Sequence, residues 1–143
     1  MIEYIPSAKA PLAIIVRAHQ FQAGVNFLTP GEYSQQLATM SHPAGTRIDP
    51  HTHRRVSREI LYTQEILVIQ KGRLRVDFYD QQKNYLESRI VQAGDIVQLI
   101  SGGHGFQVLD DLNMLEIKQG PYIGDADKER FDGVSSKEVR VEK

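Results

Sequence analysis

Two histidines separated by a single residue are the first feature of this sequence that could support chemistry. His51 and His53 flank Thr52. If this segment is a strand, side chains two residues apart point to the same side, so both imidazoles would project into one space. Such a pair could bind a divalent metal ion or exchange protons near neutral pH. The alternative is a pair of solvated surface histidines beside Arg54 and Arg55.

A glutamate and a third histidine are predicted to point toward a core. Glu65 directly precedes an apolar run and shares a strand face with Leu67, and His104 shares a face with Phe106 in the same way. A carboxylate at a core-facing position is costly unless it is paired or bound to a cation. The sequence therefore predicts one site in the interior of a β-barrel, made of His51, His53, Glu65 and His104.

The donor types restrict the metals that such a site could hold. The chain has five histidines and no cysteine, which excludes thiolate sites, iron–sulfur clusters, disulfides and cysteine nucleophiles. Imidazole and carboxylate donors suit Zn²⁺, Fe²⁺, Mn²⁺, Ni²⁺ or Cu²⁺, and the ligand set alone does not choose among these ions.

The elements that must position these residues are predicted to be strands. Gly- and Pro-containing turns separate short runs rich in β-branched and aromatic residues, which indicates an all-β sandwich or barrel. These runs are 12–17, 33–40, 66–69, 74–78, 96–100, 106–108 and 114–117. One helical turn is expected over 126–131 with Asp125 as its N-cap, and the polar tail 132–143 is expected to be loosely ordered.

The composition is that of an ordinary globular domain. The chain has 143 residues, of which 41% are apolar and 24% charged, with a formal net charge of −1. This predicts one domain and gives no general attraction to nucleic acid or to a membrane surface. The longest apolar runs are far shorter than a membrane span, and the N-terminus lacks the basic and apolar regions of a secretory signal. We therefore expect a cytoplasmic protein.

The spacing of these residues resembles the two motifs of the cupin family. Gly45 precedes the His-Thr-His element, Glu65 leads to Gly72 with the family's spacing, and Gly94 leads to a second motif that ends at His104. The resemblance covers about residues 45–117. It implies a double-stranded β-helix, which is a jelly-roll barrel of antiparallel strands. It also implies that a divalent metal is held by the family's ligand positions, which here are His51, His53, Glu65 and His104.

The resemblance also predicts how the chain is organised. The whole chain, 1–143, would be one cupin domain with its core at about 33–120. N-terminal strands would lie within 10–30, and a C-terminal tail would occupy 125–143. Because cupins often pair through their sheets, a homodimer is the expected assembly.

The sequence departs from the cupin pattern at several positions. The gap between His53 and Glu65 is longer than usual and contains Glu59, which is an alternative ligand. Ile100 replaces a proline in the second motif, the stretch before His104 is one residue short, and Val108 stands where the family often has asparagine.

The C-terminal part resembles a subset of cupins. The segments 116–122 and 127–131 are similar to the end of cupin-type sugar-phosphate isomerases and of small cupins of sugar and polysaccharide pathways. The alternative is that they are only the last strand and a capping turn. Four arginines, Arg47, Arg54, Arg55 and Arg58, bracket the His-Thr-His element. They suit an anionic substrate, or they are ordinary charges of a solvated loop.

Three classes of function fit these observations. The first is a metal-dependent isomerase, epimerase or oxygenase for a sugar-type or other small polar anionic substrate, with His51, His104 and Glu65 as catalytic residues. Its predicted substrate-binding residues are Arg47, Arg54, Tyr62 and Phe106. The second is a metal-free nucleotide-sugar isomerase or epimerase, with His51 or His104 as general base and Tyr62 or Tyr79 as acid. The third is a non-catalytic module that binds or senses a small ligand.

Overall fold

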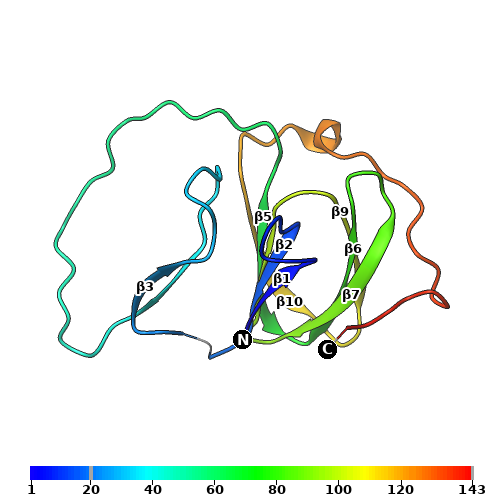
Figure 1. Cartoon of the computed structure of the whole chain (residues 1–143), viewed down its shortest axis with the longest axis horizontal. Coiled ribbons are helices and arrows are strands. Elements are labelled where there is room, and N and C mark those ends of the chain that lie inside the picture. Colours follow the sequence, from blue (N-terminus) through cyan, green and yellow to red (C-terminus); the bar gives the residue numbers. More distant parts are fainter. Residues whose placement is uncertain (20, 143) are drawn as a thin grey trace. The chain divides into compact units, whose positions relative to one another are not determined.

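The computed structural model of the chain describes residues 1–19 and 21–142, which form two compact units. The first unit comprises the described residues of Met1–Gln20 and Tyr62–Lys143, and the second is Phe21–Leu61. Ten strands and one short 3₁₀ helix, η1 (Gly124–Asp127), make up the regular structure of the described residues (Figure 1). The expectation of an all-β chain is confirmed.

The larger sheet of the first unit has five strands and carries Glu65. Its order is β1 (Ile2–Ile5), β2 (Ala13–Val16), β8 (Ile96–Leu99), β5 (Glu65–Lys71) and β10 (Asn113–Lys118). All of its strand pairs are antiparallel. The strands β2 and β8 are short and rich in Ile and Val, and both are almost fully buried, as expected for central strands.

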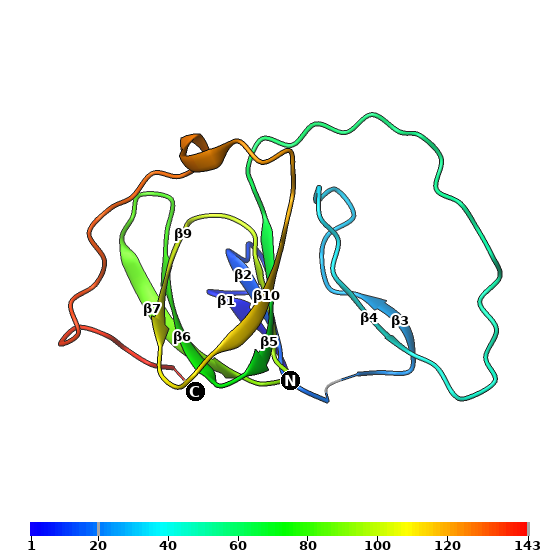
Figure 2. The same ribbon diagram turned by 180° about the vertical axis from the view of Figure 1, so that it is seen from behind.

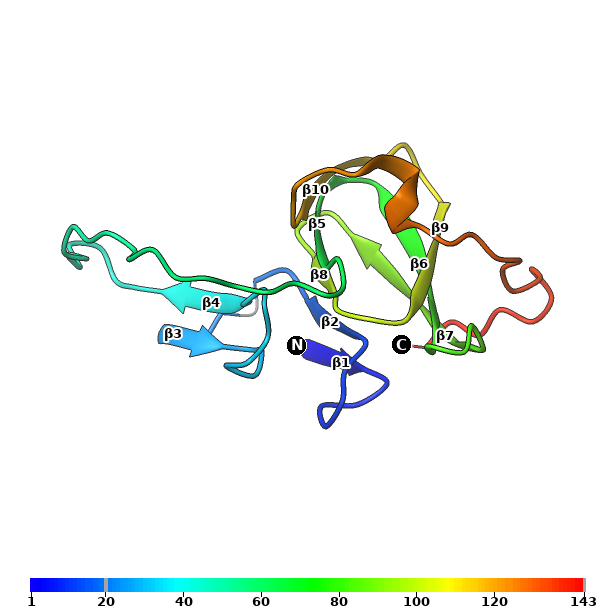
Figure 3. The same ribbon diagram turned by 90° about the horizontal axis from the view of Figure 1, so that it is seen from above.

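The smaller sheet of the first unit has three strands and carries His104. Its order is β7 (Tyr85–Gln92), β6 (Arg73–Tyr79) and β9 (Gly103–Val108). The two sheets face each other around a shared apolar core, as the view from above shows (Figure 3). This core is formed by Ile5, Ala13, Ile15, Leu67, Ile69, Leu74, Val76, Phe78, Val91, Val97 and Leu99.

The second unit is a two-stranded hairpin followed by a long irregular segment. β3 (Gly24–Phe27) pairs with β4 (Ala38–Ser41) in an antiparallel ladder (Figure 2). Residues 42–61, which include the His-Thr-His element, contain no helix or strand. The hairpin exposes apolar side chains, among them Phe27, which is 67% exposed, and Met40, which is 52% exposed.

The barrel predicted from the sequence is not closed within the residues that the structure describes. β9 pairs there only with β6, and β10 only with β5. Inward-facing side chains beside these edges are open to solvent: Phe106 is 40% exposed and Val108 is 52% exposed. The double-stranded β-helix therefore stays a prediction, although the antiparallel sheets are consistent with it.

Most of the predicted strands are present, and two strands were not predicted. The six runs from 12–17 and from 66–69 onward correspond to β2, β5, β6, β8, β9 and β10, and the run 33–40 overlaps β4 only at its end. β3 falls within 10–30, where N-terminal strands were expected, and the additional strands are β1 and β7. The predicted helical turn over 126–131 is wrong in position, because η1 ends at Asp127 and Asp125 lies inside it rather than capping it.

The C-terminal tail is tied to the smaller sheet, contrary to the expectation of loose order. The amide of Ser88 in β7 donates to the carbonyl of Arg140, and the amide of Glu142 donates to the carbonyl of Ser88. The amide of Val134 donates to the hydroxyl of Tyr79 at 3.0 Å. The tail therefore adds backbone hydrogen bonds to the outer edge of β7. Residue 143 lies outside the described residues.

Gly72, at the turn between β5 and β6, is expected to tolerate no side chain. Its φ is +83°, and a Cβ there would lie 2.3 Å from the backbone oxygen of Asp111. Both the left-handed backbone and the clash oppose alanine, so Gly72→Ala should lower the free energy of unfolding by about 1–3 kcal/mol. Urea denaturation measures this change. Gly31→Ala is the matched control, because a Cβ on Gly31 would have no other atom within 4 Å. An equal loss in both variants would contradict the prediction.

Candidate active site

The centre of the candidate site is a close pair of ionisable side chains, Glu65 and His104, between the two sheets of the first unit. The Nε2 atom of His104 lies 3.3 Å from Oε2 of Glu65. Glu65 is 7% exposed and His104 has a side-chain exposure of 33%, so the carboxylate is buried and the imidazole reaches solvent. The predicted convergence of Glu65 and His104 is therefore found in the structure.

Strand register explains why these two side chains meet. Glu65 opens β5 and lies on the same face as the buried Leu67 and Ile69, as the sequence predicted. His104 is opposite Phe78 of β6, and Phe106 is opposite Val76, so β9 turns His104 and Phe106 toward the core face of its own sheet. Glu65 and His104 therefore both lie on the core-facing side of their own sheet, which is why their side chains meet between the two sheets.

The pair is electrostatically suited to keep Glu65 charged. The hydrogen bond with His104 is the main reason that the pKa of Glu65 lies below its ordinary value, and burial opposes this shift. Lys118 lies opposite Glu65 on β10, with its Nζ atom 4.0 Å from Oε1 of Glu65, and lowers the same pKa further. A buried anion is therefore held beside a partly exposed imidazole. Such an acceptor fixes the ring orientation of the histidine.

The same two atoms are suitably spaced to bind one metal ion. With metal–ligand bonds of about 2.0–2.2 Å, two ligands of a single ion lie about 3.0–3.5 Å apart. The separation of 3.3 Å between Oε2 of Glu65 and Nε2 of His104 falls in this range. The geometry of the pair is thus compatible with half of the ligand set that the cupin resemblance implies.

The other two predicted ligands lie in the second unit. The rings of His51 and His53 are in edge-to-face contact, with centroids 5.4 Å apart, and both residues are exposed. The Nδ1 atom of His51 lies 3.0 Å from the carbonyl oxygen of Asp49. Within residues 1–19 and 21–142, no group of three or more His, Asp or Glu side chains is gathered closely enough to hold a metal. The four-ligand site stays a prediction.

The predicted substrate-binding residues are divided between the two units. Arg47 and Arg54 are exposed residues of the second unit, and Arg47 forms an ion pair with Asp49 at 3.2 Å. Phe106 lies in the first unit, with its ring centroid 5.2 Å from that of His104. Tyr62, also in the first unit, lines a pocket beside the β8–β9 loop.

The other residues that the sequence offered as alternatives can also be located. Glu59 is exposed and lies in the second unit, with Arg55 and Arg58. Tyr79 is 4% exposed, and its hydroxyl accepts a hydrogen bond from the amide of Val134. That hydroxyl is engaged by the C-terminal tail.

Sequence reasoning missed Lys118, which lies opposite Glu65 on β10. It also missed Gln98, which lies opposite Ile66 and therefore on the other face of the sheet from Glu65. Gln98 is fully buried and donates to the side-chain oxygen of Gln64 at 3.4 Å. The signal for Gln98 was present, because a glutamine inside the apolar run 96–100 must find a hydrogen-bond partner. Only strand register could have revealed Lys118.

Comparisons with known proteins identify no relative of this chain. No known protein family, no curated protein and no solved structure matches this chain. The resemblance to cupins therefore rests on the spacing of the glycines, histidines and Glu65 along the chain. A separate finding concerns membranes: none of the helices in the described part of the chain has the length and apolar character needed to cross a bilayer.

Proposed function

We propose that this chain is a small cupin-type enzyme that binds a divalent metal and acts on a small polar, sugar-type substrate. The observation that carries the proposal is the pairing of the buried carboxylate of Glu65 with the partly exposed imidazole of His104. A buried carboxylate beside an accessible histidine is costly for stability and useful for chemistry. The motif spacing adds His51 and His53 as the further ligands.

The chain's own residues define what such a site would do. When bound, a divalent metal would polarise a carbonyl or hydroxyl oxygen of the substrate. Glu65 would supply a negatively charged oxygen ligand and His104 an imidazole nitrogen ligand, and Lys118 balances part of the carboxylate charge. Phe106 packs against the His104 ring and offers an apolar, partly exposed surface beside it. We also propose that the chain forms a homodimer, as the resemblance implies.

Metal content tests this proposal directly. Protein purified without chelators is expected to carry about one equivalent of a divalent metal, and His51→Ala is expected to carry well under half of it. Elemental analysis after gel filtration measures both values. Arg47→Ala, at an exposed position on the same segment, is the matched control and should keep the wild-type metal content. Wild-type protein without metal, or an unchanged content in His51→Ala, would contradict the proposal.

A second candidate is a metal-free isomerase or epimerase in which His104 is the general base. The same observation favours it, because a carboxylate that accepts from one imidazole nitrogen prepares the ring for proton transfer. The two candidates differ in one result. Turnover of a nucleotide sugar that persists after complete removal of metal, and that is lost in His104→Gln, would favour the metal-free mechanism.

A further inference from the structure

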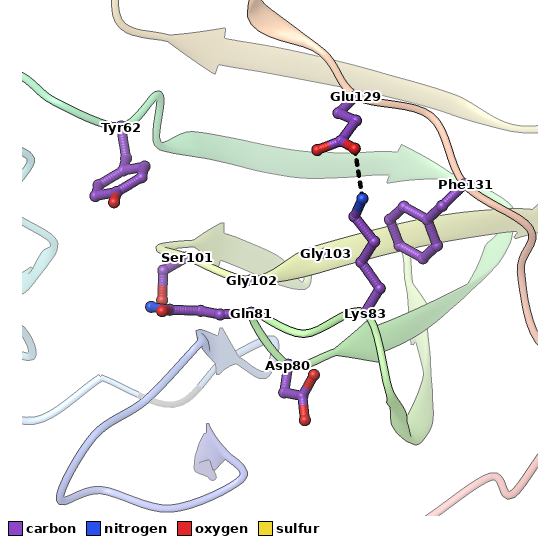
Figure 4. A pocket seen from close by; sticks show the side chains of 9 residues that line it. All are labelled: Tyr62, Asp80, Gln81, Lys83, Ser101, Gly102, Gly103, Glu129 and Phe131. Carbon is purple, nitrogen blue, oxygen red and sulfur yellow. Dashed lines mark hydrogen bonds and ion pairs between the residues drawn. The ribbon is translucent and has the colours of Figure 1, made fainter.

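A pocket lies beside the β8–β9 loop of the first unit, apart from the Glu65–His104 pair. Its volume is about 410 Å³. It is built by three segments far apart in the sequence, namely the β6–β7 turn, the β8–β9 loop and residues 129–131, with Tyr62 at its side (Figure 4). A volume of this size falls in the range of sites for small ligands. The loop continues directly into His104, so a ligand in this pocket would lie close to the candidate site along the chain.

Fixed backbone contacts shape the floor of this pocket. Gly102 has a φ of +74°, and a Cβ on Gly103 would lie 2.7 Å from Cζ of Phe131. The absence of a side chain at Gly103 lets the Phe131 ring approach the backbone of the loop. That ring also makes an edge-to-face contact with Tyr79, with centroids 5.1 Å apart. The Phe131 ring is therefore held in place by the backbone of the loop and by the ring of Tyr79.

The charges of the pocket disfavour an anionic ligand. Lys83 is its cation, and Nζ of Lys83 lies 2.5 Å from Oε1 of Glu129 and 5.8 Å from the centre of the Phe131 ring (Figure 4). Asp80 accepts hydrogen bonds from the side chain and amide of Asn84, which keep its pKa below the ordinary value. The charged residues of the lining are two carboxylates, Asp80 and Glu129, and one ammonium group, Lys83. The net charge of the lining is therefore negative.

The polar groups left for a ligand are uncharged. The side chains of Gln81 and Ser101 have no hydrogen-bond partner among the described residues, and both line the pocket. An amide and a hydroxyl provide donors as well as acceptors, which matches a ligand that has several hydroxyl groups. The rings of Phe131 and Tyr62 provide apolar surface for the carbon face of such a ligand.

We propose that this pocket binds a neutral, hydroxyl-rich ring such as a monosaccharide unit. The pocket would then select the uncharged part of a sugar-type substrate, whereas the anionic character predicted from the arginines has no counterpart in it. This inference rests on the proposed function only for the claim that the bound ring is part of the enzyme's substrate. Binding itself needs no metal.

The test is a titration of ¹⁵N-labelled, EDTA-treated protein followed by NMR chemical shifts. The probes are the methyl glycosides of glucose, galactose, mannose and rhamnose, with glucose 6-phosphate as the charged comparison. At least one neutral glycoside is expected to shift the amides of Gly102 and Gly103, with a Kd in the millimolar range. Glucose 6-phosphate is expected to bind at least about fivefold more weakly than the best neutral glycoside.

Substitutions of residues that line the pocket test whether the glycosides bind there. Gln81→Ala and Ser101→Ala should each raise the Kd about fivefold, the usual effect of losing one neutral hydrogen bond. Gln82→Ala is the matched control, because it lies in the same turn but does not line the pocket. Glu129→Gln should improve the binding of glucose 6-phosphate by releasing Lys83.

Three results would overturn the inference: no shift with any neutral glycoside, tighter binding of the phosphate, or an unchanged Kd in both pocket variants. Because the metal is removed throughout, failure here is distinct from failure of the proposed metal site. That site is judged by metal content and metal affinity.

Discussion

Asp95→Ala is expected to lower the free energy of unfolding by about 3–5 kcal/mol, because two backbone amides and Arg17 lose a buried acceptor. Asp95 is 2% exposed, and its two carboxylate oxygens accept three hydrogen bonds. The donors are Nη1 of Arg17 at 2.8 Å, the amide of Ala18 at 2.9 Å and the amide of Gln92 at 3.1 Å. Alanine would leave two backbone amides and a largely buried guanidinium without this acceptor.

Urea denaturation followed by circular dichroism measures this loss. Asp110→Ala is the matched control, because Asp110 also pairs with an arginine, Arg73, at 2.6 Å, but on the surface. Exposed pairs contribute about 0–1 kcal/mol, so the control should change little. If Asp95→Ala does not fold, Asp95→Asn, which keeps one acceptor oxygen, should fold with a smaller loss. A loss in Asp95→Ala no larger than in the control would contradict this role.

The strands that the sequence predicted are those whose burial follows side-chain type. In β6, apolar residues alternate with polar ones from Arg73 to Phe78, and in β5 the apolar run Ile66–Ile69 alternates between partly buried and buried positions. β7 was missed because its pattern is obscured by polar residues. Ser88 in its centre is fully buried, and its hydroxyl shares a hydrogen bond with the Tyr85 hydroxyl at 2.8 Å and also bonds to the buried Asp77. Only tertiary contacts explain why a serine is buried there.

The candidate site could be predicted where strand alternation alone places a residue. Glu65 and His104 follow from the alternation of their own strands, and the structure brings them together. Lys118 depends on the register between β5 and β10, which the sequence does not reveal. The pocket depends on the docking of Phe131 against Gly103 of the β8–β9 loop, and the sequence placed Phe131 in a helical turn without indicating this contact.

Glu65→Gln is expected to weaken the binding of a divalent metal by more than about 100-fold. Loss of a residue that only supports a ligand already costs about 10–100-fold, so removing a charged ligand should cost at least as much. Stability should change by less than about 1 kcal/mol, since His104 and Lys118 both reach solvent and burial of the carboxylate is itself unfavourable. The glutamine can still accept a hydrogen bond from His104.

Titration of Zn²⁺ or Mn²⁺ into EDTA-treated protein, measured by calorimetry, gives the affinity, and urea denaturation of the metal-free protein gives the stability. Glu59→Gln is the decisive comparison, because the sequence alone leaves Glu59 as the alternative ligand. The pairing of Glu65 with His104 predicts that Glu59→Gln keeps the wild-type affinity. The opposite result, with loss in Glu59→Gln and none in Glu65→Gln, would move the ligand to the second unit. It would leave Glu65 as the orienting partner of a metal-free His104, since the carboxylate still has to balance the charge of Lys118 in a buried position.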